Sequence, residues 1–206
     1  MTTLSDHEPW LIPYIPKSGN IAIDVGSAQG LWTEALASRF KHVVALDPVQ
    51  QLRVLPYDNI SFIKKAAWSH PAHLTFRSFN NMDQTSAVFG RGEYRNYDKE
   101  IASNEADAIK IDSLKLKGVD FIKIDVEGAE LEVLKGSRKT IKKNSPHILI
   151  EVHNPQQVAE IHKSLLFYEM TVIPRPDGET YNLWLYCKPI SANIEKFYVK
   201  LLEFML

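Results

Sequence analysis

Cysteine is almost absent from this 206-residue sequence, and neither a long apolar run nor a strong net charge is present. Because Cys187 is the only cysteine, no internal disulfide can form, and a reducing compartment is the expected setting. No apolar run approaches the roughly 18 residues that span a bilayer, and no signal peptide is recognisable. A net charge of −1 makes nucleic acid an unlikely partner. We therefore expect a cytoplasmic protein with no membrane partner.

The sequence does contain a regular alternation of strand and helix patterns. Main strands are predicted at residues 20–25, 42–46, 60–67, 119–126, 147–152, 168–173 and 181–187, and helices at 29–40, 49–55, 129–143 and 156–166. Residues 73–111 interrupt the alternation with short inserted strands at 73–76, 85–89 and 108–111 and a polar, substrate-side loop around 90–100. This pattern predicts an α/β fold with a seven-stranded, mostly parallel sheet, helices on both faces and a small antiparallel insertion.

The length favours a single domain over residues 1–206. Residues 1–19 read as an irregular lead-in or a short first helix. Residues 190–206 have the spacing of an amphipathic helix, which could pack on the sheet or form the surface of a homodimer.

A strand-to-helix turn follows the first predicted strand, in the sequence Asp24-Val-Gly-Ser-Ala-Gln-Gly30. Gly26, Ser27 and Gly30 suit a backbone that passes close to a ligand. The later glycines of the Gly-x-Gly-x-x-Gly fingerprint are missing, which argues against NAD or FAD. Asp24 suits a cationic ligand better than a pyrophosphate, and S-adenosylmethionine carries both a sulfonium and an ammonium group. The turn therefore predicts a site for S-adenosylmethionine.

The ends of the next two strands add further candidate cofactor ligands. Asp47, followed by Pro48, ends the second strand at the spacing where a carboxylate commonly accepts hydrogen bonds from ribose hydroxyls. Ala67 and Trp68 end the third strand and would flank the adenine by analogy of position. Each residue alone could be an ordinary turn or cap residue, but together they favour a cofactor site.

Acidic residues and a histidine end two later strands, in Phe121-Ile-Lys-Ile-Asp-Val-Glu-Gly-Ala-Glu130 and Ile148-Leu-Ile-Glu-Val-His153. If the strand at 119–126 lies beside the first strand, Asp125 reaches the point where ligands bind in such sheets, and Glu151 and His153 flank the same cleft. A hydroxyl acceptor would gain from a base, for which His153 is the leading candidate; a structural histidine is the alternative. No tight ligand motif is present, so we predict no metal.

These segments resemble the FkbM family of S-adenosylmethionine-dependent methyltransferases. The similarity extends from about residue 21 onward and is carried by Asp24-Val-Gly, Ala45-Leu-Asp-Pro48, Ile111-Asp-Ser-Leu114, Phe121 to Glu130, Val133-Leu-Lys-Gly136, Glu151-Val-His153 and Asn182-Leu-Trp-Leu185. The family often has glutamate where Asp47 stands, and Trp68 is bulkier than expected. The resemblance implies a Rossmann-like class I methyltransferase that methylates a hydroxyl of a sugar, glycan or small natural product.

Two other functions fit the sequence less well. An RNA methyltransferase could use a basic cluster together with the aromatic and arginine residues of the loop at 89–97; the cluster comprises Lys135, Arg138, Lys139, Lys142 and Lys143. The near-zero net charge instead favours a solvated helix face and a substrate lid. A non-catalytic scaffold that kept the fold is the other alternative, although the intact acids at positions 24, 47 and 125 argue against it.

Overall fold

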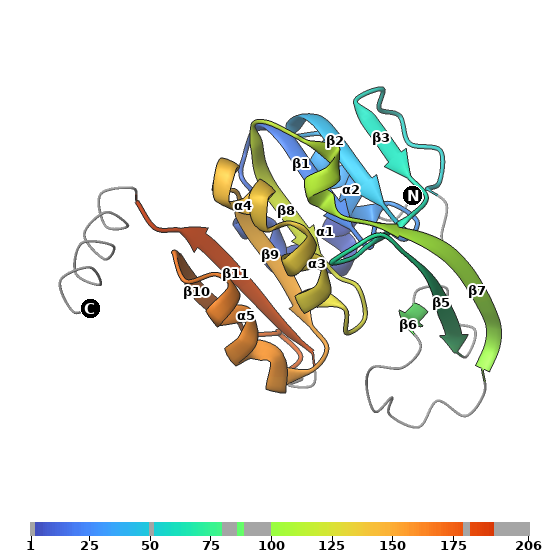
Figure 1. The fold of residues 1–206 in the computed structure, drawn as a ribbon. Coiled ribbons are helices and arrows are strands. Elements are labelled where there is room, and N and C mark those ends of the chain that lie inside the picture. The colour runs from blue at the N-terminus through green and yellow to red at the C-terminus, as the bar shows by residue number, and fades with distance from the viewer. Residues whose placement is uncertain (1–2, 50–51, 80–85, 89–99, 179–181, 192–206) are drawn as a thin grey trace.

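The computed structural model describes residues 3–49, 52–79, 86–88, 100–178 and 182–191. Its main sheet has seven strands in the order β10-β11-β9-β8-β1-β2-β3 (Figure 1). The strands are β1 (Gly19–Val25), β2 (Phe40–Leu46), β3 (Ile60–Ile63), β8 (Val119–Ile124), β9 (His147–Val152), β10 (Tyr168–Ile173) and β11 (Leu183–Pro189). Only β11 runs antiparallel to its neighbours. The predicted seven-stranded, mostly parallel sheet is therefore confirmed.

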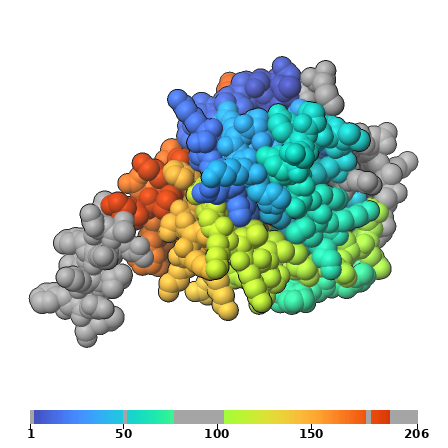
Figure 2. All heavy atoms as spheres, turned by 90° about the horizontal axis from the view of Figure 1, so that it is seen from above, coloured from blue at the N-terminus to red at the C-terminus, as the bar shows by residue number. Residues whose placement is uncertain are grey.

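Both faces of the main sheet are covered, which explains why its central strands are almost wholly apolar. On one face, α1 (Leu4–His7), η1 (Pro9–Tyr14) and α2 (Leu31–Ala37) pack on Ala22, Val43 and Phe121. On the other face, η2 (Ile111–Leu114), α3 (Glu130–Gly136), α4 (Arg138–Asn144) and α5 (Val158–Ser164) pack on Ile23 and Ile122. Figure 2 shows the N-terminal residues and the stretch around residues 110–144 on opposite sides of the molecule.

The predicted insertion forms a second sheet with the strand order β4-β7-β5-β6. Its strands are β4 (Ala66–Ala67), β5 (Ala72–Phe79), β6 (Ser86–Val88) and β7 (Glu100–Ile109), and β5 pairs antiparallel with both β6 and β7. In Figure 1, β5 and β7 extend together away from the main sheet. The antiparallel character is as predicted, but β7 begins at Glu100, inside the stretch that we expected to be a loop.

Several predicted boundaries were wrong for identifiable reasons. The strand expected at 60–67 is divided between the two sheets, because the chain leaves β3 after Ile63 and pairs with β7 from Ala66. The helix expected at 129–143 is divided at Ser137, whose hydroxyl donates to the carbonyls of Val133 (2.8 Å) and Leu134 (3.2 Å). Such a bond from a serine to the preceding turn competes with the helical pattern.

Other predicted helices are shorter than expected or lie partly outside the described residues. The helix predicted at 29–40 extends only over α2, because Phe40 already belongs to β2. Residues 52–55, the larger described part of the helix predicted at 49–55, are not helical. A short 3-10 turn, η3 (Pro155–Gln157), precedes α5. Residues 192–206 of the predicted C-terminal helix lie outside the described part of the chain. Among the described residues, no helix is long and apolar enough to cross a membrane.

Candidate functional site

A cavity of about 670 Å³ lies at the carboxyl ends of β1, β2, β8 and β9. This volume falls within the range typical of small-molecule and cofactor sites. Its position matches the rule that open α/β sheets bind ligands beyond the carboxyl ends of their strands. The position follows from the strand order, because β8 lies directly beside β1, as expected, and beside β9 on its other edge.

Most of the predicted site residues line this cavity: Gly26, Ser27, Asp47, Pro48, Ala67, Trp68, Asp125, Glu151 and His153. Asp24 and Gly30 are not part of the lining. Gly30 has a φ of 95° at the start of α2, and a Cβ atom there would lie 3.0 Å from a side-chain carbon of Leu52. Asp24 is fully buried below the glycine turn. Both residues therefore support the glycine turn without lining the cavity.

The glycine turn passes so close to the loop after β8 that only glycine fits. Gly26 has a φ of 76°, and a Cβ atom on it would lie 1.7 Å from the carbonyl oxygen of Asp125. The amides of Gly26 and Ser27 both donate to the carbonyl of Leu46, at 2.9 and 3.1 Å. The hydroxyl of Ser27 is buried without a hydrogen-bond partner among the described residues. Because buried polar groups are normally satisfied, this hydroxyl fits a ligand that bonds to it.

Asp47 is held in one orientation at the end of β2. Its carboxylate oxygens accept hydrogen bonds from the amides of Ala28 (3.0 Å) and Val49 (2.9 Å). The side chain thus joins the glycine turn to the segment after β2, and it lines the cavity. A carboxylate has about four acceptor positions, so one carboxylate can accept several hydrogen bonds at once, including those from vicinal hydroxyls.

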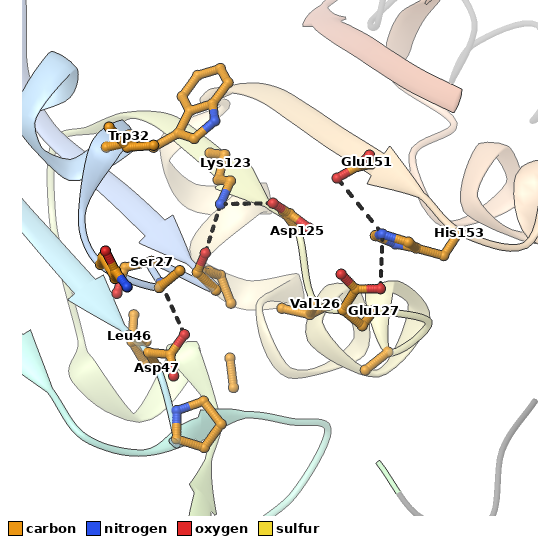
Figure 3. Close-up of a pocket in the computed structure, with 18 of the residues that line it drawn as sticks. Ser27, Trp32, Leu46, Asp47, Lys123, Asp125, Val126, Glu127, Glu151 and His153 are labelled. Carbon is orange, nitrogen blue, oxygen red and sulfur yellow. Dashed lines mark hydrogen bonds and ion pairs between the residues drawn. The ribbon is translucent and has the colours of Figure 1, made fainter. Parts of the chain in front are cut away.

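A buried lysine supports the glycine turn. The ammonium of Lys123 donates to the carbonyl of Gly26 (2.7 Å) and pairs with Asp24 (3.4 Å) and Asp125 (3.3 Å), as Figure 3 shows in part. Burial disfavours its charged form, but Asp125 and Asp24 raise the pKa of Lys123 above its usual value. Burial also raises the pKa of Asp24, against the effect of Lys123 and of a 2.6 Å hydrogen bond from Thr33.

His153 lies among three carboxylates (Figure 3). Its Nδ1 atom is 2.9 Å from Glu130, and its Nε2 atom is 3.2 Å from Glu127 and 3.7 Å from Glu151. Burial opposes protonation, but the hydrogen bond to Glu130 and the negative charges of Glu127 and Asp125 raise the pKa of His153 to about 10. The ring is therefore an imidazolium near neutral pH, which differs from the neutral base considered from the sequence.

The carboxyl groups around His153 differ in protonation. Burial alone would raise the pKa of Asp125, but Lys123 and His153 lower it below its usual value. Burial and the charge of Asp125 raise the pKa of Glu151 to about 9. Burial likewise raises the pKa of Glu127 to about 7, with His153 opposing this effect. The cluster therefore holds an ionised carboxylate at Asp125 beside Glu127 and Glu151, whose pKa values are raised, which is an arrangement suited to proton transfer.

The same cluster has the composition of a metal site. Ligand atoms of Asp125, Glu127 and His153 lie within 4.8 Å of one another. A metal would need a neutral imidazole, however, and both ring nitrogens of His153 already face carboxylates. In the described residues, the positive charge of this site comes from His153 and Lys123.

Several cavity-lining residues were not among the candidates from the sequence, including His7, Glu8, Trp10 and Arg175. Another, Asn182, belongs to a segment that carries the family resemblance but had been given no role. Glu8 accepts a hydrogen bond from the indole of Trp32 (2.9 Å), and the guanidinium of Arg175 lies 5.9 Å from the ring centre of Trp10. Asn182 donates to Glu151 (3.3 Å). Residues 1–19 showed no motif, so only the folded chain brings them to the site. Lys123 could have been found, since strand alternation places it on the same face as Asp125.

The residues of the RNA hypothesis do not converge on this cavity. Its basic cluster lies on α3 and α4, exposed to solvent and outside the cavity lining: Lys135, Arg138, Lys139, Lys142 and Lys143. The loop at 89–97 lies outside the described residues. The basic cluster is therefore an exposed helical surface.

Solved structures with the same fold include several methyltransferases. Methyltransferase FkbM from Methylobacillus flagellatus KT is 17% identical over 83% of this chain, with a TM-score of 0.55, and this chain spans only 44% of that protein. SMU.1697c from Streptococcus mutans, in complex with SAH, is 14% identical with a TM-score of 0.52, covering 88% of this chain and 93% of the other. An rRNA methylase from Streptococcus thermophilus is 12% identical with a TM-score of 0.52, covering 93% and 98%. At these identities the similarity shows the fold alone.

The family assignment comes from the sequence. No curated protein matches this chain. Residues 24–171, well over half of the chain, match the model of the methyltransferase FkbM domain. That range contains the glycine turn, Asp47 and the whole cluster around His153. The chain belongs to the FkbM methyltransferase family.

Proposed function

We propose that this protein transfers a methyl group from S-adenosylmethionine to a hydroxyl oxygen of a sugar, a glycan or another small molecule. The observation that carries the proposal is one cavity with two unlike walls. The glycine turn and Asp47 form one wall, and Asp125, Glu151 and His153 form the other. Membership of the FkbM family and the likeness in fold to a protein in complex with SAH support this choice. S-adenosylmethionine supplies an electrophilic methyl group on a sulfonium.

The first wall would bind the cofactor. Asp47, oriented by two backbone amides, would accept hydrogen bonds from the ribose hydroxyls. Ser27 would bond to the ligand through its buried hydroxyl, beside the backbone of Gly26. Ala67 and Trp68 line the cavity past Asp47 and would flank the adenine together with Pro48.

The second wall would orient the acceptor and accept its proton. Forming a methyl ether from an alcohol releases one proton, which a nearby base must take. Asp125 is a candidate, because it lines the cavity and Lys123 and His153 keep its carboxylate ionised and able to accept a proton. The imidazolium of His153 would stabilise the negative charge of the carboxylates, and Glu151 would share the proton with Asp125. Alignment of the acceptor with the methyl group in a site that excludes water would supply the rest of the rate enhancement.

Calorimetric titration with S-adenosylmethionine and S-adenosylhomocysteine tests the proposal. The wild-type protein should bind both at micromolar concentrations. Asp47→Ala should weaken binding about 10- to 100-fold, the usual worth of hydrogen bonds to a charged group. Asp58→Ala, an exposed residue outside the cavity, is the matched control and should bind like the wild type.

Two outcomes would decide against the proposal or redirect it. If folded wild-type protein binds neither compound, the methyltransferase function is wrong and a scaffold function takes its place. If both compounds bind, hydroxylated acceptors can be screened for methyl transfer, with the product identified by mass spectrometry. Methylation at nitrogen or carbon in that screen would contradict the choice of oxygen.

A further inference from the structure

The N-terminal segment is fixed against the cavity. Leu4, Leu11 and Ile15 are buried in the core cluster that also contains Trp32. The guanidinium of Arg39 donates to the carbonyl of Ile15 at 3.0 Å and anchors the end of the segment. Three of its side chains reach the cavity wall: His7, Glu8 and Trp10.

Glu8 is the acidic residue of this group. Within the described residues, the only hydrogen bond to its carboxylate comes from a neutral donor, the indole of Trp32, at 2.9 Å. Burial raises the pKa of Glu8; the bond from Trp32 opposes this effect, and the negative charge of Asp125 adds to it. Lys123 and Arg175 offset the effect only in part. A partly buried carboxylate with this surrounding is stabilised when a cationic ligand binds next to it.

The position of Glu8 indicates which cation. Trp32 lies in the first turn of α2, directly after the glycine turn, so Glu8 is tied to the part of the cavity that this turn lines. Lys123 links the glycine turn to Asp125, because its ammonium donates to the carbonyl of Gly26 and pairs with the carboxylate of Asp125. Figure 3 shows Trp32 and Lys123 on the side of the cavity away from Asp47, so the bond to Trp32 ties Glu8 to that side.

We propose that Glu8 binds the ammonium group at the methionine end of S-adenosylmethionine. The inference rests on the proposed function, since it assigns a contact within the same cofactor site. It also gives the N-terminal segment a role in cofactor binding. A carboxylate beside an ammonium can form charge-assisted hydrogen bonds, which are stronger than neutral ones.

The test compares three ligands on the wild-type protein and on Glu8→Gln by calorimetry. Glutamine keeps an oxygen that can accept the bond from Trp32, so the substitution removes the charge and retains the contact. S-adenosylmethionine and S-adenosylhomocysteine both carry the ammonium, whereas 5′-methylthioadenosine lacks the whole amino-acid part. Binding of the first two should weaken about 10- to 100-fold. Binding of 5′-methylthioadenosine should not change.

A control variant and the remaining outcomes separate this inference from the proposed function. Glu160→Gln removes a charge from the exposed face of α5, outside the cavity lining, and should bind all three ligands like the wild type. Unchanged binding to Glu8→Gln, or equal weakening of all three ligands, overturns the inference while wild-type binding still supports the proposed function. Weakening of S-adenosylmethionine alone would place Glu8 at the sulfonium and overturn the ammonium assignment. A wild-type protein that binds none of the three sinks both proposals.

Discussion

The ammonium of Lys123 lies 3.4 Å from a carboxylate oxygen of Asp24, and both side chains are almost completely withdrawn from solvent. Removing one partner of a buried pair leaves the other charge uncompensated, at a cost of about 3–5 kcal/mol. We therefore expect Lys123→Met to lower the free energy of unfolding by about this amount, measured by urea denaturation. The glycine turn should also loosen, because Lys123 bonds to the carbonyl of Gly26.

The double variant Asp24→Asn/Lys123→Met completes the cycle. Without either charge, position 24 no longer holds a buried ion that lacks Lys123, and only Asp125 still loses an ion-pair partner. The double variant should therefore be more stable than the sum of the single effects predicts. Additive losses would show that the two side chains do not depend on each other.

Gly26→Ala tests whether the close approach of the glycine turn to the loop after β8 is required. Gly178 provides a matched control, because its φ of 75° is almost the same as the 76° of Gly26 and a Cβ atom there would contact none of the described residues within 4 Å. Gly178→Ala should lose only about 1–2 kcal/mol through backbone strain. Gly26→Ala should lose clearly more stability and also bind S-adenosylmethionine more weakly. Equal losses in the two variants would mean that the contact with Asp125 has no importance.

Cys187 should be unreactive in the folded protein. Its side chain is fully buried, and burial raises the pKa of its thiol to about 12. The thiolate is the reactive form, so iodoacetamide at pH 8 should leave the native chain unmodified and alkylate it fully in denaturant. Mass spectrometry distinguishes the two states by one added group, since the chain has a single cysteine. Rapid native labelling would contradict the packing of β11 in the sheet core.

The parts of the fold that could be predicted are those set by local patterns. Apolar runs ending in acidic residues located β1, β2, β8 and β9. From the sequence, the position of β8 beside β1 was only a condition, which the structure meets. From that arrangement alone, Asp125 could be expected near the glycine turn. Glu151 and His153 followed from the same reasoning, because they end the neighbouring strand.

The parts that could not be predicted depend on contacts between distant segments. Glu8 reaches the site only because residues 4–15 dock on α2, and no motif near Glu8 encodes that docking. The protonation of His153 could not be predicted from the sequence either, since it depends on Glu130, which reaches the ring only in the folded chain. The division of one predicted strand into β3 and β4 arises because β7 offers a better partner after Ile63.

His153 should remain protonated well above neutral pH. Its pKa is raised to about 10, with the hydrogen bond to Glu130 as the largest raising effect. NMR titration of the imidazole nitrogens should therefore show an imidazolium at pH 8. Glu130→Gln should move the midpoint to lower pH, because it removes the charge that the ring faces through Nδ1. A midpoint near the ordinary value of 6.5 in the wild-type protein would rule out this description of the cluster.

The same shift makes stability depend on pH with a definite sign. The pKa of His153 is higher in the folded state than the ordinary 6.5, so its stabilising effect is complete below about pH 6.5 and is lost as pH rises toward 10. The carboxyl groups that face it are those of Asp125, Glu127, Glu130 and Glu151. His153→Gln should therefore be less stable than the wild type by a few kcal/mol at about pH 6. The difference, measured by denaturation, should shrink between about pH 7 and 10, because the wild-type ring then loses its proton and the same carboxylates face a neutral group in both proteins. A difference that grows with pH would mean that neutral His153 is the stabilising form, and the ring would then be available as the base that takes the acceptor's proton.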